Sequence, residues 1–90
     1  MRLYRKRPVT VHAMEFAGGI DSYLKIVESL RELNVTVADE LRFTAPILLV
    51  PTLEGTMAAN PGDWIVVGVQ GEVYPVKPDI FAAIYDEVNA

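Results

Sequence analysis

The stretch PGDWIVVGVQGEVYPVKPDIF, residues 61–81, decides the fold because it holds the clearest turn and strand signals in the chain. Pro61-Gly62 is a turn signal, since proline fixes φ at the first central position and glycine accepts a positive φ at the next. Trp64 to Val69 reads as a strand, Gln70-Gly71 turns the chain, and Glu72 to Val76 returns. The stretch therefore predicts a β-hairpin.

The end of the same stretch predicts a helix. Pro75 cannot donate a hydrogen bond to a neighbouring strand, so the second strand of the hairpin is expected at a sheet edge. Pro78 suits the first turn of a helix, with Asp79 near the positive end of its dipole. Trp64 alternates with Val66 on one strand face and is predicted to pack in the core. The buried face of the helix is predicted to comprise Ile80, Phe81, Ile84, Tyr85 and Val88.

Residues 8–33 predict a strand followed by a helix. PVTVHAMEF (8–16) alternates apolar and polar side chains, which is the pattern of a strand. Asp21 or Ser22 can then cap a helix that runs to about residue 33. The apolar stripe of that helix is predicted to comprise Ile20, Tyr23, Leu24, Val27, Leu30 and Leu33.

The middle of the chain reads as β structure. Residues 35–43 hold one or two short strands, and residues 56–59 return after a Glu54-Gly55 turn. ILLVPTL (47–53) is nearly continuous in apolar residues, as in a strand covered on both faces or lying at a subunit contact. Two-sided burial is difficult in so thin a domain, so this run predicts self-association, most simply as a homodimer.

Together these segments predict a single α+β domain over residues 1–90. It has one helix, a meander of about five short antiparallel strands forming a bent sheet or half-barrel, and a short C-terminal helix. No apolar run approaches the ~18 residues of a membrane span, so a cytoplasmic protein is expected. The net charge of −4 argues against general nucleic-acid binding.

The residues that could carry catalysis are few. The sequence has no cysteine, which excludes disulfides, thiolate catalysis and cysteine-based zinc sites. His12 is the only histidine, and it is either a partly exposed strand residue or a hydrogen-bonded core histidine, or else a general base or ligand. Asp63, Glu72 and Asp79 are expected to have structural roles, because a hairpin holds the first two at opposite ends. We therefore expect no catalytic residue, metal ion or cofactor, and predict that the protein is not an enzyme.

A binding surface is the remaining prediction. Tyr74 and Lys77 are the two residues of the opening stretch that turn and strand geometry leave unexplained. Four of the eight basic residues lie in the first seven positions, among them Arg5 and Arg7. This basic segment is either a solvated edge, in which case it could meet the acidic C-terminus, or a small anion site. With Lys77 and Tyr74 it could bind a nucleotide or another anion.

Residues 52–88, TLEGTMAANPGDWIVVGVQGEVYPVKPDIFAAIYDEV, resemble the C-terminal signature of a group of small phage and prophage-encoded proteins of unknown function. In that group a TLEG turn precedes PGDWI, GV-x-GE-x-YP and KPDIF, and the opening YRKRPVTVHAMEF (4–16) also matches. Val76 departs from the group, in which many members carry a cysteine, and this speaks against a thiol-based activity. Asp86-Glu87 also departs, because Tyr-Glu is usual there. The resemblance implies a phage or prophage origin and a setting in the bacterial host cytoplasm, with no established activity, cofactor or catalytic residue.

Two functions follow as hypotheses. The first is a non-enzymatic accessory protein that acts by binding a host or phage protein, for example in counter-defence. The alternative is a small-ligand binder that sequesters a nucleotide or another anion, with the basic N-terminal residues near Lys77.

Overall fold

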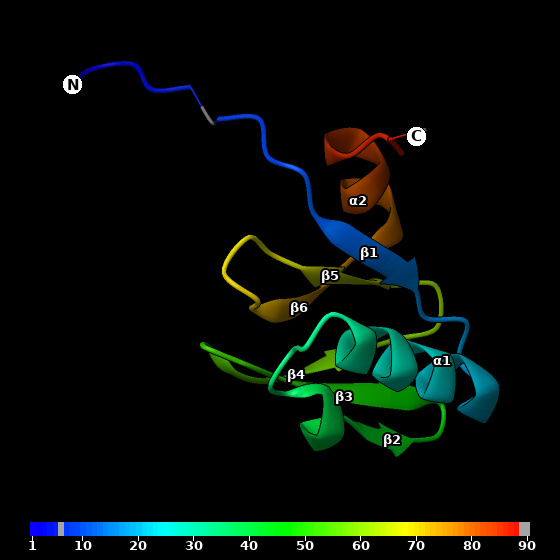
Figure 1. Cartoon of the computed structure of the whole chain (residues 1–90). Coiled ribbons are helices and arrows are strands. Elements are labelled where there is room, and N and C mark those ends of the chain that lie inside the picture. The colour runs from blue at the N-terminus through cyan, green and yellow to red at the C-terminus, as the bar shows by residue number, and fades with distance from the viewer. Residues whose placement is uncertain (6, 89–90) are drawn as a thin grey trace.

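The computed structural model describes residues 1–5 and 7–88 and has a mixed α+β architecture, as the sequence predicts (Figure 1). In chain order its elements are β1 (His12–Glu15), α1 (Ile20–Glu32), a 3₁₀ turn η1 (Ala38–Glu40), β2 (Arg42–Thr44), β3 (Ile47–Thr52), β4 (Gly55–Ala59), β5 (Trp64–Val67), β6 (Val73–Val76) and α2 (Pro78–Ile84).

The strands form two three-stranded antiparallel sheets, in the orders β1-β5-β6 and β2-β3-β4, where the sequence predicts one bent sheet or half-barrel. The division occurs at the turn between β4 and β5. Backbone hydrogen bonds tie this turn to the end of β1: Phe16 N–H donates to the carbonyl of Asp63 (2.8 Å), and Gly62 N–H donates to the carbonyl of Phe16 (2.7 Å). These bonds direct β5 into pairing with β1, so the chain changes sheets after β4.

The hairpin predicted from the opening stretch is confirmed as β5 and β6. Gly62 adopts φ +96° and the Asp63 N–H donates to the carbonyl of Asn60 at 2.9 Å, which closes the turn before β5. Gly71 adopts φ +82° in the turn after it. β6 lies at the edge of its sheet, where the missing N–H of Pro75 is tolerated.

The core lies between α1 and the two sheets. Phe16, Ile26, Leu48 and Val50 are among its fully buried side chains. The predicted helix is confirmed, but its buried face is rotated from the predicted stripe. Ile26, Val27 and Leu30 are buried, whereas Ile20 and Leu24 are more than half exposed. Two apolar rows overlap on this helix, and the row with the spacing 23, 26, 27 and 30 faces the core.

The apolar run after residue 46 forms β3, the middle strand of its sheet. Its side chains alternate: Leu48 and Val50 are fully buried, whereas Ile47 and Leu49 are half-buried on the other face. One face of the strand is thus covered within a single copy. The run does not by itself require a subunit contact.

α2 packs on the opposite face of the β1-β5-β6 sheet from α1 and the second sheet (Figure 1). The prediction of its buried face is wrong in most positions. Phe81 and Tyr85 are half-buried against the sheet, while Ile80 (49%) and Ile84 (55%) in the neighbouring row are exposed, and Val88 (74%) lies beyond the end of the helix. Residues 81 and 85 are four apart and share one side of the helix, so Ile80 and Ile84 lie about 100° away from it.

Trp64 is also misplaced by the sequence prediction. It is half-buried and lies on the α2 face of the sheet rather than in the core. The prediction is wrong because β5 has apolar residues on both of its faces, so the pattern does not indicate which face meets the core. Ile65 and Val67 supply the core, and Val66 lies buried on the face that carries Trp64. Neither helix within the described residues has the length and hydrophobicity needed to cross a membrane.

Candidate functional site

Lys77, which the sequence leaves without a structural role, forms an ion pair with Asp63. Its Nζ lies 3.2 Å from Asp63 Oδ2, and that oxygen also accepts a hydrogen bond from the Asn60 N–H at 2.8 Å. Asp63 is buried, with 3% of its surface exposed, whereas the Lys77 side chain is 54% exposed. The pair joins the turn before β5 to the residue that precedes α2. An anion approaching Lys77 would compete with a carboxylate already in place.

Tyr74 lies on β6 opposite Val66 of β5 and shares the α2 face of the sheet. Burial raises the pKa of the Tyr74 hydroxyl to about 12, with further contributions from a hydrogen bond and proximity to Tyr85 and from the nearby charge of Glu72. The phenol therefore stays neutral well above its ordinary range. Tyr74 therefore interacts with the C-terminal end of α2 through Tyr85, the residue that follows the helix.

Arg5 and Arg7 lie on an exposed N-terminal segment. This segment leaves the body at β1 and extends away from it (Figure 1). Within the described residues, neither arginine makes an ion pair, and neither contacts Lys77 or Tyr74 through a side-chain hydrogen bond. Lys6, which belongs to the same basic group in the sequence, lies outside the described residues. The structure thus gives Lys77 and Tyr74 packing partners but does not join the arginines to them.

A groove lies between α2 and the segment that enters β1, and we call it the α2 groove. Its volume is about 420 Å³. Its floor is aromatic: the rings of Trp64 and Phe81 are stacked at 4.2 Å between centroids and 4° between planes, and Tyr85 follows at 5.0 Å from Phe81. The complete lining comprises Val9, Thr10, Val11, His12, Ala13, Trp64, Phe81, Tyr85, Asp86, Glu87 and Val88.

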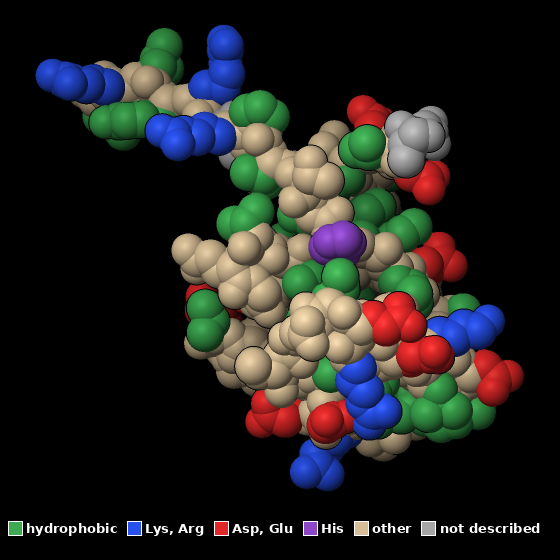
Figure 2. All heavy atoms as spheres, in the orientation of Figure 1, with side chains coloured by type: hydrophobic (Ala, Val, Ile, Leu, Met, Phe, Trp, Pro, Cys, Tyr) green, Lys and Arg blue, Asp and Glu red, His purple; other side chains and the backbone are tan. Residues whose placement is uncertain are grey.

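The rim of the α2 groove carries negative charge. Asp86 and Glu87 are both exposed and lie at the C-terminal end of α2. Figure 2 shows acidic side chains gathered there, and basic side chains along the extended N-terminal segment. Stacked aromatic rings with nearby carboxylates attract cations and repel anions. The groove is therefore suited to a cationic, partly apolar occupant.

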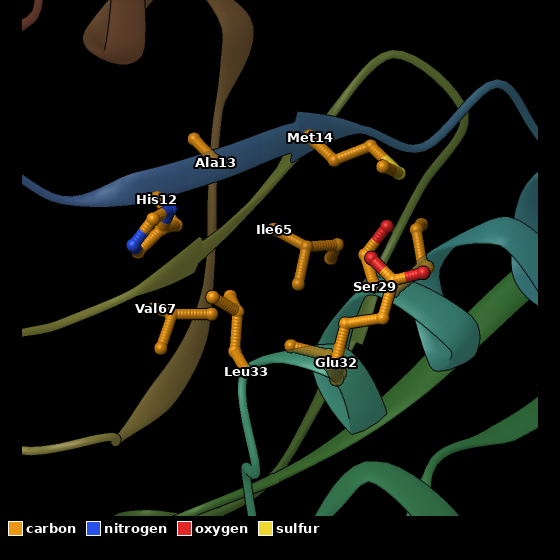
Figure 3. A pocket seen from close by; sticks show the side chains of 10 residues that line it. His12, Ala13, Met14, Ser29, Glu32, Leu33, Ile65 and Val67 are labelled. Carbon is orange, nitrogen blue, oxygen red and sulfur yellow. The ribbon is translucent and has the colours of Figure 1, made fainter.

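A second, smaller cleft lies between β1 and the C-terminal half of α1. Its volume is about 260 Å³ and its floor is formed by core residues, including Ile65 and Val67. In Figure 3, His12 lies at the strand end of this cleft, while Ser29 and Glu32 lie on the helix side. No side-chain hydrogen bond joins these three groups in the described part of the chain. His12 is an exposed residue of β1.

The other acidic residues of the opening stretch have local structural roles. Glu72 Oε1 accepts a hydrogen bond from the Gln70 N–H at 3.3 Å, and its side chain occupies the space that a Cβ at Gly68 would need. Asp79 is exposed in the first turn of α2. Over residues 1–5 and 7–88, no three acidic or histidine side chains are grouped closely enough to hold a metal ion.

Sequence reasoning missed the α2 groove because it assigned the whole apolar face of α2 to the core. The signal was present in the spacing of Phe81 and Tyr85, which predicts one aromatic row, and in the separate row of Ile80 and Ile84. It also missed the Lys77–Asp63 pair, although the predicted hairpin with its turn at Gln70-Gly71 already implies that residues 63 and 77 lie at one end. β5 and β6 place the two residues at the same end of one hairpin.

Comparisons with protein-family models, with curated proteins and with solved structures return no match for this chain.

Proposed function

We propose that the protein is a non-enzymatic accessory module that binds another protein, and that its α2 groove takes an extended, basic segment of that partner. The observation that carries the proposal is an aromatic floor with an acidic rim, beside apolar side chains that the fold leaves exposed. In line with the resemblance of residues 52–88, the setting proposed is the cytoplasm of a bacterial host. The partner would be a host or phage protein, for example a defence component.

Shape supports a peptide segment as the occupant. The groove lies between α2 and the segment from Val9 to Ala13, with Trp64, Phe81 and Tyr85 on its floor. An extended chain can place alternate side chains on the aromatic floor while its other side chains reach the rim. Val88 in the groove lining and Ile84, which precedes Tyr85 in the chain, are both more than half exposed, so a partner would bury them as well.

Charge supports a basic segment. The net charge of the chain is −4, and the rim of the groove adds the local field of Asp86 and Glu87. Arginine suits this surface because its guanidinium stacks on aromatic rings and pairs with carboxylates. The alternative, sequestration of a nucleotide or another anion, would require Lys77 to leave Asp63, and the lining of the groove contains no lysine or arginine to bind an anion.

Trp64 allows a direct test, because it is the only tryptophan and lies on the floor of the groove. We expect a synthetic peptide that alternates arginine with leucine or tyrosine to produce a saturable change in tryptophan emission. The affinity should fall as salt is added, since exposed charges are screened. A nucleoside triphosphate titrated in the same way serves as the anion probe and should leave the emission unchanged.

Matched charge variants locate the interaction. Asp86→Asn/Glu87→Gln removes both rim charges and should weaken peptide binding by about tenfold, the equivalent of two exposed ion pairs. Glu28→Gln/Glu54→Gln makes the same change of net charge at exposed positions outside the groove and should leave the affinity as it was. The proposal would be overturned if the unmodified chain and the two variants bound the peptide with equal affinity. It would also be overturned if no chain bound the peptide, or if only the nucleotide gave a saturable change in emission.

A further inference from the structure

The N-terminal arm, residues 1–8, exposes apolar side chains for which the fold provides no cover. Leu3 is 102% exposed and Tyr4 is 90% exposed, and every described residue of the arm is exposed to solvent. Burial of such side chains is favourable in proportion to the apolar area removed from water. The arm is therefore a segment whose apolar residues would gain from contact with a second surface.

The charges of the arm and of the remaining chain are opposite. The arm carries four of the eight basic residues and no acidic residue, so residues 9–90 hold four basic and all twelve acidic residues. The rim of the α2 groove presents two of those acids, Asp86 and Glu87. The arm combines arginines with the apolar side chains of Leu3 and Tyr4, and thus has the positive charge and apolar surface that suit the acidic rim and aromatic floor of the groove.

Local geometry makes it difficult for the arm to enter its own groove. The arm joins the body at Val9, which is itself part of the groove wall, and it points away from the body (Figure 1). Entry would require a reversal near Arg7-Pro8. The residue before a proline favours extended conformations, and the chain has no glycine before Gly18 to form a tight turn there.

A second copy removes this difficulty. Two copies related by a twofold axis present the same arm and the same groove to each other, so both contacts form at once. Eight extended residues reach about 26 Å, whereas a helix with the seven residues of α2 is about 10 Å long. The arm can therefore cross the α2 groove of a partner copy with Leu3 and Tyr4 over the aromatic floor.

We propose that two copies of the chain exchange their N-terminal arms, each arm lying in the α2 groove of the other. This inference rests on the proposed function, because it names one basic segment that the groove accepts. A host or phage protein would then bind by displacing the arm.

Cysteine cross-linking tests the exchange, because the chain contains no cysteine of its own. Separately purified Tyr4→Cys and Val88→Cys chains, mixed under mild oxidation, should form a disulfide-linked heterodimer. Leu53→Cys, exposed in the turn between β3 and β4, replaces Val88→Cys as the matched control. We expect the arm–groove pair to link at least about tenfold faster than the control pair, as proximity raises the effective concentration.

Charge reversal adds a second criterion. Arg5→Glu/Arg7→Glu in the Tyr4→Cys chain should slow the linkage to the control rate, and Asp86→Lys/Glu87→Lys in the Val88→Cys chain should restore it. Arm exchange would be overturned if the Tyr4→Cys and Val88→Cys chains formed a disulfide no faster than the control pair, with or without the charge reversals. So would an internally linked monomer formed in dilute solution by the double variant Tyr4→Cys/Val88→Cys, which would place the arm in its own groove.

The two proposals fail separately. If the synthetic basic peptide binds at Trp64 while the arm gives no specific cross-link, the proposed function stands and arm exchange is wrong. If neither the peptide nor a peptide with the sequence of residues 1–8 alters Trp64 emission, both proposals are wrong.

Discussion

The two helices of this small domain meet the sheets in different ways. α1 has thirteen residues and buries Ile26, Val27 and Leu30 in the core between the sheets. α2 has seven residues and no fully buried residue; it rests on the other face of the β1-β5-β6 sheet through Phe81 and Tyr85. The core is complete without the outer face of α2. That face is consequently available for binding.

Length explains part of the difference. A helix of seven residues is marginal by itself, because nucleation is costly and few hydrogen bonds repay it. α2 is held by the Trp64–Phe81 stack, by the Tyr74–Tyr85 contact and by the Lys77–Asp63 pair at its start. We therefore expect the α1 side to set stability and the α2 side to set binding, and the following substitutions separate these roles.

The largest expected effect is on the α1 side. Leu30→Ala should lower the free energy of unfolding by about 2–5 kcal/mol, since it removes a buried side chain and leaves a cavity. Ile84→Ala, on the exposed row of α2, should change it by no more than about 0.5 kcal/mol. Denaturant unfolding followed by circular dichroism measures both. Equal losses would show that the two helices contribute alike.

Phe81→Ala should have the next largest effect. The half-buried ring loses both its apolar contact and its stack on Trp64, and we expect a loss of about 1.5–3 kcal/mol. Trp64 should also become more exposed, with its emission shifted to longer wavelength. Ala82→Ser, at an exposed position on the same helix, is the control and should alter neither quantity. An unshifted emission in Phe81→Ala would contradict the stacked arrangement.

The Lys77–Asp63 pair should prove asymmetric. Asp63→Ala removes the buried acceptor of the Asn60 N–H and should cost about 1–3 kcal/mol. Lys77→Met removes only the half-exposed partner, where solvent screens the charge, and should cost about 0.5–1 kcal/mol. Thermal unfolding of both variants measures the difference. A larger loss for Lys77→Met would give Lys77 a role beyond this ion pair.

The smallest effect is a dependence on alkaline pH. The pKa of Tyr74 is raised from 10.0 to about 12 in the folded chain, so the folded state holds the phenol proton more tightly than the unfolded state. Its contribution to stability is fully present below pH 10 and is lost as the pH rises towards about 12. Across this pH window, the free energy of unfolding should fall less steeply in Tyr74→Phe than in the control Tyr4→Phe. Identical slopes would contradict the raised pKa.

Much of the fold could be predicted from local signals. The β5–β6 hairpin follows from Pro61-Gly62, Gly71 and the alternation between them, and the start of α2 follows from Pro78. Each of these depends on the intrinsic backbone preference of one residue or a short pattern, so the sequence alone is sufficient.

The division into two sheets could not be predicted in the same way. It depends on hydrogen bonds between Phe16 and the Gly62-Asp63 turn, residues more than forty positions apart, which no local pattern reports. The candidate site could not be predicted, because neither Lys77 nor Tyr74 lines the α2 groove. Lys77 and Tyr74 were identified as unexplained, but their partners are Asp63 and Tyr85, which only the paired strands and α2 bring near. In addition, α2 has two neighbouring apolar rows, and the sequence does not indicate which of them packs on the sheet.

Hydrogen exchange of the two helices, with and without the basic peptide, tests the central claim most directly. In the free protein, amides of α2 should exchange at least about 100-fold faster than the central amides of α1, because few buried contacts oppose local opening. Added peptide should slow exchange in α2 and in the segment from Val9 to Ala13 while leaving α1 unchanged. Equal protection of both helices in the free protein, or peptide protection centred on α1, would contradict the division between a stabilising helix and a binding helix.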